Sequence, residues 1–142
     1  MKWSKRALLG GAMVAAGLST HGAAALTLDC KNAAHVPVSM AVAYLDYDGK
    51  TWLVEGWYTL EAGSRATIEL DSDNNIFYIF GEFKGGQQVS GGSGSLELPI
   101  YYRTFKYVQD VKGVVNPDAV VPFSRGYADN GRAVITLGPI KQ

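Results

Sequence analysis

The chain has 142 residues, of which 13 are lysine or arginine and 13 are aspartate or glutamate, so its formal charge at pH 7 is zero. Proteins that bind nucleic acid or an anionic membrane surface carry an excess of basic residues in a patch or stripe, which this composition does not provide. The sequence also has a single cysteine, Cys30, so it cannot form a disulfide within one chain.

The first 25 residues have the three parts of a secretory signal peptide. Lys2, Lys5 and Arg6 form a basic head, ALLGGAMVAAGL is a short apolar run, and Ala23 and Ala25 lie in the register of a cleavage site. The apolar run is shorter than the roughly 20 residues that span a bilayer, and no later stretch is a better candidate. We therefore expect cleavage after Ala25, a periplasmic or secreted protein, and no membrane span in the mature chain.

Cleavage leaves residues 26–142, which are 117 residues (142 minus 25) and the size of one domain. The cut removes three basic residues and no acidic ones, so the mature charge is −3 (10 minus 13). A mildly acidic single domain without a basic stripe argues against nucleic acid as a partner.

Alternating apolar and polar residues, rich in β-branched and aromatic side chains, predict strands along most of the mature chain. The expected strands are residues 26–31, 36–46, 51–60, 65–70, 76–83, 96–108 with a break at Pro99, 119–123 and 132–137. No segment outside the signal carries a helical pattern. Seven or eight short strands predict an all-β fold, a small antiparallel β-sandwich, with a partly open β-barrel as the alternative.

Cys30 falls on the first expected strand of the mature chain. Free cysteine is among the most buried residue types, so we expect a buried, free thiol. An intermolecular bridge or a reactive thiol is the alternative. Lipidation of Cys30 is disfavoured because Asp29 precedes it, where a lipidation site has a small residue.

Residues 41–57 predict a β-hairpin, and its loop decides which side chains face the core. A three-residue loop of residues 47–49, with Gly49 in the left-handed conformation, pairs Tyr44 with Trp52. One face of the hairpin then carries nearly all of the large apolar side chains. The other face carries small residues together with Glu55 and Trp57, so only the first face is expected to be a core.

A two-residue turn at Asp48 and Gly49 is the alternative, and it brings Glu55 beside Val42. That register buries a carboxylate in an apolar layer, which costs several kcal/mol unless the group protonates or finds a partner. We therefore favour the three-residue loop, in which Glu55 faces solvent and Glu55→Gln changes stability by less than about 1 kcal/mol.

Trp57 and Glu55 are the candidate binding residues. In the favoured register the indole of Trp57 lies over the small residues Ser39 and Ala41 with the carboxylate beside it, which makes a shallow recognition surface. The alternative is that another strand or loop covers Trp57, because large exposed aromatic side chains are uncommon.

Motifs for metal or nucleophilic chemistry are weak. The mature chain has one histidine, His35, beside an expected turn, where a surface or capping role is favoured over that of a catalytic base. One cysteine and one histidine cannot build a zinc site of several such ligands. DSDNNIFYIFGE has EF-hand spacing, but Ile76 stands where the loop needs glycine and the following residues predict a strand. We therefore expect no metal, no cofactor and no catalytic residue.

Residues 84–95 form a glycine- and serine-rich run without the lysine of a phosphate-binding loop, and we expect a flexible loop or a weak edge strand. A carboxylate pair for hydrolysis is possible in principle, with Glu55 as one member and Glu69, Glu82 or Glu97 as the other. Because a domain of this size offers little room for a deep cleft, an enzyme is the less favoured class.

The sequence resembles the bacterial domain of unknown function 1036 family. The residues that carry the resemblance are Cys30 and Asn32, the segment from Trp52 to Gly63 with its EGWY run, and the later RGY segment. Two departures stand out, since this chain has Ala62 and Arg65 where the family has the proline and cysteine of a PGxC turn, and it has no cysteine before RGY. The resemblance implies a small exported domain and supplies no activity and no catalytic residues.

Together these features predict an exported β-sandwich that acts as a non-catalytic binding or interaction module of the cell envelope, with an unknown ligand or envelope protein as partner. A small hydrolase with paired carboxylates is the second class. The third is a structural envelope protein that assembles through an exposed strand edge near the glycine-rich loop.

Overall fold

The structure is a computed structural model that describes residues 25–89, 94–109 and 116–139. The predicted signal peptide, apart from Ala25, and residues 90–93 of the glycine-rich run lie outside the described residues. Across the described ranges there is no helix long and apolar enough to cross a membrane.

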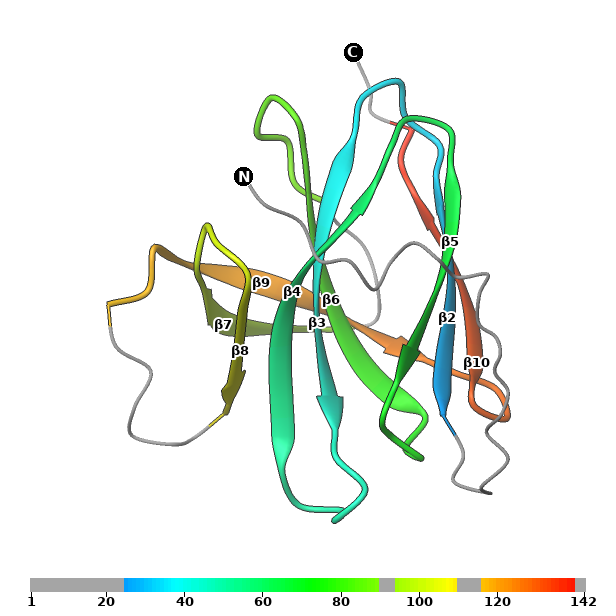
Figure 1. Cartoon of the computed structure of the whole chain (residues 1–142), viewed down its shortest axis with the longest axis vertical. Helices are drawn as coiled ribbons and strands as arrows, with labels where there is room; N and C mark the ends of the chain where they lie inside the picture. Colours follow the sequence, from blue (N-terminus) through cyan, green and yellow to red (C-terminus); the bar gives the residue numbers. More distant parts are fainter. Residues whose placement is uncertain (1–24, 90–93, 110–115, 140–142) are drawn as a thin grey trace.

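The described residues form strands and connecting turns (Figure 1). The strands are β2 Leu26–Asn32, β3 Val38–Leu45, β4 Trp52–Leu60, β5 Arg65–Leu70, β6 Ile76–Phe83, β7 Ser95–Ile100, β8 Phe105–Val108, β9 Ala119–Tyr127 and β10 Arg132–Leu137. The bounds of β5, β6 and β10 are those predicted from the sequence. The expected strand 96–108 does break, but the break follows Ile100 rather than falling at Pro99, which lies within β7.

Two sheets pack against each other, so the predicted all-β sandwich is confirmed. One sheet has the order β10-β2-β5 and the other has the order β7-β9-β6-β3-β4-β8. All neighbouring strands are antiparallel except β10 and β2, which are parallel. The larger sheet is curled like half of a barrel, and Figure 1 shows β7 and β8 on the side away from the smaller sheet, while β9 runs across the molecule toward β10.

The curl gives the larger sheet two buried faces. Its convex face packs on the smaller sheet, and this first core holds Leu28 and Ile68 from the smaller sheet with Met40 and Tyr44 from the larger one. Its concave face encloses a second core, which lies inside the curl. The second core contains Ala41, Ala43, Val54, Trp57, Phe80, Leu98, Ile100, Tyr101, Phe105, Val121 and Phe123. The prediction that only one face of the β3–β4 hairpin is a core is therefore wrong.

The register of the hairpin also differs from the favoured prediction. Leu45 pairs with Trp52 and Val42 pairs with Glu55, which is the pairing that the rejected two-residue turn implied. The loop is longer than that turn, because Asp46 N–H donates to the carbonyl of Thr51 at 2.7 Å. A carboxylate oxygen of Asp48 accepts from the backbone N–H groups of Lys50 and Thr51, at 2.7 and 2.8 Å. These bonds stabilise the observed loop, in the way that aspartate side chains commonly stabilise turns.

A β-bulge in β4 then changes which face each residue occupies. Ala41 pairs with Gly56, whereas Met40 pairs with Tyr58, so Trp57 is an extra residue with no partner on β3. Beyond the bulge, Tyr58 faces the first core and Trp57 faces the second. A Cβ atom on Gly56 would lie 2.9 Å from a ring carbon of Phe105, so the close approach at the bulge requires glycine.

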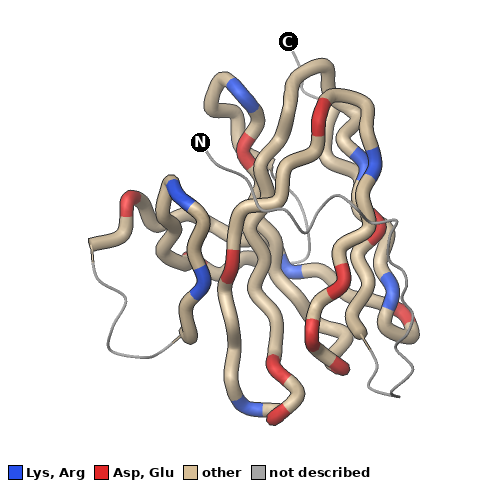
Figure 2. Tube along the Cα trace, in the orientation of Figure 1, with Lys and Arg blue, Asp and Glu red and all other residues tan. Residues whose placement is uncertain are grey.

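Charged residues are spread over the surface of the described chain. Figure 2 shows lysine and arginine interspersed with aspartate and glutamate on both sheets, without a stripe of one sign.

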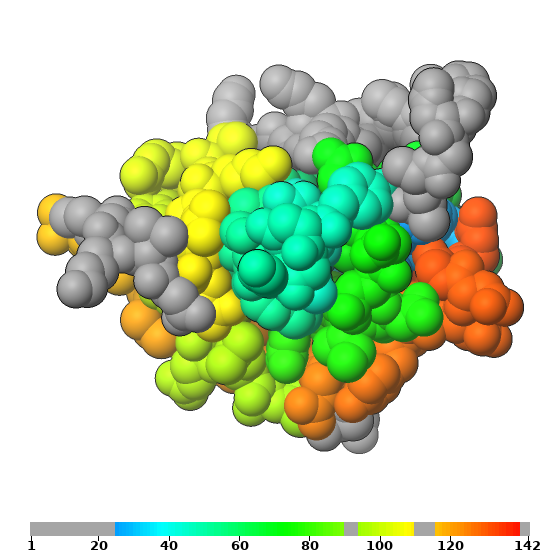
Figure 3. All heavy atoms as spheres, turned by 90° about the horizontal axis from the view of Figure 1, so that it is seen from below, coloured from blue at the N-terminus to red at the C-terminus, as the bar shows by residue number. Residues whose placement is uncertain are grey.

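Seen from below in Figure 3, the β3–β4 loop is flanked by the β7–β8 segment on one side and by the β5–β6 turn on the other. Tyr47 at the tip of that loop has its pKa raised, first by desolvation and then by the charges of Asp71, Asp73 and Asp46.

Candidate functional site

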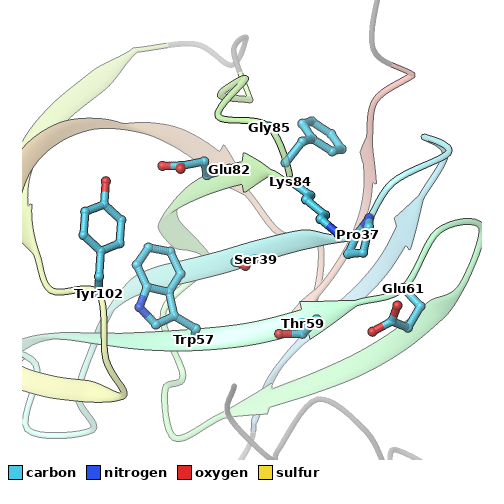
Figure 4. Close-up of a pocket in the computed structure, with 10 residues that line it drawn as sticks. Pro37, Ser39, Trp57, Thr59, Glu61, Glu82, Lys84, Gly85 and Tyr102 are labelled. Atoms are coloured by element: carbon cyan, nitrogen blue, oxygen red, sulfur yellow. The ribbon is translucent and has the colours of Figure 1, made fainter. Parts of the chain in front are cut away.

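A pocket of about 500 Å³ lies at one end of the concave face of the larger sheet (Figure 4). Its lining comes from β3, β4 and β6, from the residues just before β3 and just after β4, and from the turns that follow β6 and β7. The lining residues are Pro37, Ser39, Trp57, Thr59, Glu61, Glu82, Phe83, Lys84, Gly85 and Tyr102. Segments distant in the sequence therefore meet at this site.

The base of the pocket is a row of polar side chains across three strands. Ser39 on β3 pairs with Glu82 on β6 on one side and with Thr59 on β4 on the other. Two residues further along β3 and β6, the same face carries Ala41 and Phe80, which are buried in the second core. The polar row thus marks the place where the apolar interior of the curl ends.

Trp57 and Tyr102 form the aromatic wall of the pocket. Trp57 is 1% exposed, and its indole Nε1–H donates to the carbonyl of Tyr101 at 2.8 Å. The ring planes of Trp57 and Tyr102 differ by 4° with their centroids 6.4 Å apart, and Phe80 and Phe105 contact the indole edge to face. The alternative prediction, that another part of the chain covers Trp57, is therefore correct, and exposure on a flat face is excluded.

Glu82 and Tyr102 interact at one end of the pocket, as the close-up in Figure 4 shows. Desolvation raises the pKa of the half-buried Glu82 carboxyl, and a hydrogen bond from Tyr102 opposes that rise. The pKa of the Tyr102 hydroxyl is raised by desolvation first, and also by the negative charges of Glu82 and Asp118. This end of the pocket therefore carries a carboxylate that is partly deprived of water.

The raised pKa of Glu82 predicts how stability depends on pH. The ordinary pKa is 4.5, and the folded value lies above it, so the folded state binds this proton more tightly than the unfolded state. Below 4.5 the group is protonated in both states and contributes nothing; as the pH rises through the folded pKa, the cost of its desolvated charge appears. We expect Glu82→Gln to match the wild type in thermal melts at acidic pH and to melt higher at pH 7. A lower melting temperature for the variant at pH 7 would contradict this.

The other end of the pocket is more open. Glu61 and Lys84 are exposed and lie at the Pro37 end in Figure 4. Between the two ends, the Thr59 hydroxyl oxygen is buried, and among the described residues it has no hydrogen-bond partner. A buried hydroxyl without a partner is uncommon in folded proteins, and this one adjoins the pocket.

Glu55 lies on the opposite face of the sheet from this pocket, in the first core. It is 5% exposed, so the prediction that it faces solvent is wrong. Its carboxylate accepts hydrogen bonds from the hydroxyls of Tyr44, at 3.0 Å, and Tyr58, and it pairs with Lys106 at 3.6 Å. These partners are what permits a carboxylate to be buried, and they give Glu55 a structural role.

The structure therefore separates the two residues predicted to share a binding surface, and only Trp57 reaches the pocket. It also separates the predicted carboxylate pairs. Glu55 and Glu82 face opposite sides of the larger sheet, and Glu69 and Glu97 are exposed on β5 and β7. The carboxylates that share a pocket are Glu61 and Glu82.

Cys30 is free and buried, as predicted. Burial, and then the charge of Asp29, raise the pKa of its thiol to about 12. His35 is exposed, as predicted for a surface histidine. Among the described residues no group of three or more histidine, cysteine, aspartate or glutamate side chains is placed to hold a metal ion.

The buried thiol makes a second prediction. Because the thiolate is the reactive form and the pKa of Cys30 is about 12, the native protein should react with Ellman's reagent at pH 8 at least about a hundredfold more slowly than the unfolded protein. Labelling with and without denaturant, followed by absorbance, measures this ratio. Equal rates in the two states would show that the thiol is accessible.

Two features that carry the family resemblance have structural roles. The side chain of Asn32 is buried, donates to the carbonyls of Val36 and Leu60, and accepts from the N–H of Ala34, so it fastens the end of β2 to neighbouring loops. In the RGY segment, a Cβ atom on Gly126 would lie 2.5 Å from a ring carbon of Phe77. The glycine is therefore required by packing of β9 on β6.

A smaller groove of about 290 Å³ lies between β6, β9 and β10. Tyr127 and Val134 at its rim are 58% and 78% exposed, and its lining is mainly apolar. Buried or half-buried polar groups are fewer here than in the pocket beside Trp57, so the latter is the stronger candidate for a specific ligand site.

Sequence reasoning missed Thr59 and Tyr102 as site residues. It named Glu82 only as a possible member of a carboxylate pair with Glu55, and Ser39 only as a small residue beneath Trp57. A partial signal exists in β6, where Glu82 is in phase with Phe80 in an otherwise apolar strand, so one buried face ends in a carboxylate. No family model, curated protein or solved structure matches the chain. The resemblance to the domain of unknown function 1036 family therefore stays a prediction.

Proposed function

We propose that the protein is an exported, non-catalytic binding module of the cell envelope, and that its ligand is a small molecule held in the pocket beside Trp57. The observation that carries the proposal is the change from apolar to polar lining at the end of the concave face. There Glu82, Ser39 and Thr59 form a row next to a packed aromatic wall. Ligand pockets generally combine apolar surface with a few placed polar groups in this way.

The wall of the pocket supports a preformed site. Trp57 is held by ring contacts on several sides and by the hydrogen bond to Tyr101, so its position is fixed before any ligand arrives. A preformed site has less side-chain entropy to lose on binding, which favours affinity. The half-exposed Tyr102 is the part of the wall that a ligand can contact without disturbing the core.

A comparison of two exposed tyrosines tests the proposal. Tyr102 and Tyr47 are 46% and 40% exposed, but only Tyr102 lines the pocket. We would measure ligand-induced shifts in melting temperature across a panel of envelope glycan fragments, amino acids, amines and nucleotides. We expect at least one class to stabilise wild type and Tyr47→Ala but not Tyr102→Ala. If every compound that binds raises the melting temperatures of the two variants equally, the pocket is not the ligand site.

A second candidate function is hydrolysis, because Glu61 and Glu82 share the pocket and the pKa of Glu82 is raised. Glycosidases use two carboxyl groups placed across one cleft, and the one that acts as the acid has a raised pKa. Chromogenic glycoside and ester substrates test it. Turnover that Glu61→Gln and Glu82→Gln each abolish, with folding retained, would establish an enzyme in place of a binding module.

Export is tested separately from binding. We expect the full chain, expressed in a bacterium with an outer membrane, to be recovered from the periplasm or the medium with Leu26 as its first residue. Recovery of the intact chain from the cytoplasm would contradict this part of the proposal.

A further inference from the structure

The charges around the pocket favour a cationic ligand. Glu61 and Glu82 line it, against the single ammonium group of Lys84. A further carboxylate, that of Asp118, accepts a hydrogen bond from the backbone N–H of Tyr102 at 2.8 Å. Glu82 is therefore the charged lining residue at the end where Tyr102 lies, and Lys84 lies toward the other end in Figure 4.

The aromatic wall favours the same chemistry. The nitrogen edge of the Trp57 indole is turned to Tyr101, so the carbocyclic part of the ring faces the pocket, as Figure 4 shows. The faces of tryptophan and tyrosine rings carry partial negative charge and attract organic cations. Proteins commonly recognise quaternary ammonium ligands with aromatic rings in this way.

From these two observations we propose that the group recognised in the pocket is an organic ammonium, such as a primary or methylated amine. Its positive charge would lie between the carboxylate of Glu82 and the exposed ring of Tyr102, which is stacked with the buried indole of Trp57. This inference rests on the proposed function and names the chemical class of its ligand.

Partial desolvation makes Glu82 the selective element of this site. A carboxylate that has lost part of its water gains more from a nearby cation than a fully hydrated one does. A neutral hydroxyl compound would supply hydrogen bonds to Glu82 but no charge, and an anion would be repelled by it. The polar remainder of an amine would lie over Ser39 and Thr59, because both residues line the same pocket.

The test uses two compounds of nearly the same shape that differ in charge. The probes are choline and its uncharged analogue 3,3-dimethylbutan-1-ol, titrated into the protein expressed as the full chain and followed by calorimetry. We expect choline to bind at least about tenfold more tightly than the alcohol, the margin that a cation–π contact of typical strength provides. Equal affinities, or tighter binding of the alcohol, would overturn the inference.

Two variants test whether Glu82 causes the preference for choline. Glu82→Gln keeps the shape of the side chain and should abolish the preference for choline, whereas Glu97→Gln, on the exposed face of β7, should leave it unchanged. Circular dichroism melts confirm that each variant is folded. If Glu82→Gln still binds choline more tightly than the alcohol, another group recognises the positive charge and the inference fails.

The outcomes also separate this inference from the proposal on which it rests. Binding of neutral glycans that depends on Tyr102, together with no binding of choline, would refute the ammonium ligand and leave the binding module standing. If neither the two probes nor any compound of the panel binds, both are refuted.

Discussion

Glu55→Ala is expected to lower the free energy of unfolding by about 3 kcal/mol, because it removes the acceptor for two tyrosine hydroxyls inside the first core. Tyr44 and Tyr58 both donate to the carboxylate and are each 1% exposed. Their hydroxyls would lose this acceptor without gaining access to water. Urea melts at pH 7, followed by circular dichroism, measure the change.

Glu97→Ala is the matched control, since Glu97 is an exposed glutamate on an edge strand and should change stability by less than about 0.5 kcal/mol. A double-mutant cycle tests whether the loss of stability comes from the tyrosine hydroxyls. Tyr58→Phe should lower the free energy of unfolding by less in Glu55→Ala than in the wild type. A loss for Glu55→Ala as small as that for Glu97→Ala would mean that Glu55 faces solvent and that the hairpin register differs from the one described.

Trp57→Ala is expected to cost about 3–5 kcal/mol, the range for removing a large aromatic side chain from a packed core. The indole contacts Phe80, Phe105 and Tyr102 and is almost wholly buried, so its loss leaves a cavity in the second core. The same urea melts measure this loss.

Trp52→Ala provides the comparison, because Trp52 lies on the same strand, is only partly buried and contacts Tyr78 edge to face. We expect it to cost clearly less than Trp57→Ala. Trp57→Phe should fall between the wild type and Trp57→Ala, since it keeps a ring in the core but loses the hydrogen bond to Tyr101. Equal losses for the two tryptophan-to-alanine variants would contradict a buried Trp57.

The strands could be predicted from the sequence because their signal is local. Alternation and β-branched residues give β5, β6 and β10 at their observed bounds. The two-sheet arrangement followed from the number of strands and their length. The curl of the larger sheet did not follow, because it depends on how β7, β8 and β9 pair with strands distant in the sequence.

The faces of β4 could not be predicted because alternation fails at a bulge. In a regular strand, residues 55 and 58 face opposite sides, yet the extra residue at Trp57 brings Glu55 and Tyr58 to the same side, where they form a hydrogen bond. Burial of an unpaired carboxylate is costly, which is why the sequence favoured an exposed Glu55. In the fold, the hydroxyls of Tyr44 and Tyr58 donate hydrogen bonds to it, so the buried carboxylate is paired.

The pocket depends on contacts that no local pattern encodes. Trp57 was found as a candidate because of its residue type, but its neighbour Tyr102 comes from the turn after β7, 45 residues later (102 minus 57). Glu82 joins them through the pairing of β3 with β6. Only the folded arrangement brings a half-buried carboxylate and two aromatic rings to one place.

The central claim is that the polar end of the concave face is where a ligand binds. The most direct measurement is a two-dimensional nitrogen–proton NMR spectrum of the labelled protein during titration with choline, in which the indole N–H of Trp57 and that of Trp52 serve as internal probes. We expect the resonances of the Trp57 indole and of the Ser39 and Thr59 amides to shift, and that of the Trp52 indole to stay in place. Saturable shifts confined to the groove around Tyr127 and Val134, with none at the Trp57 indole, would contradict this claim.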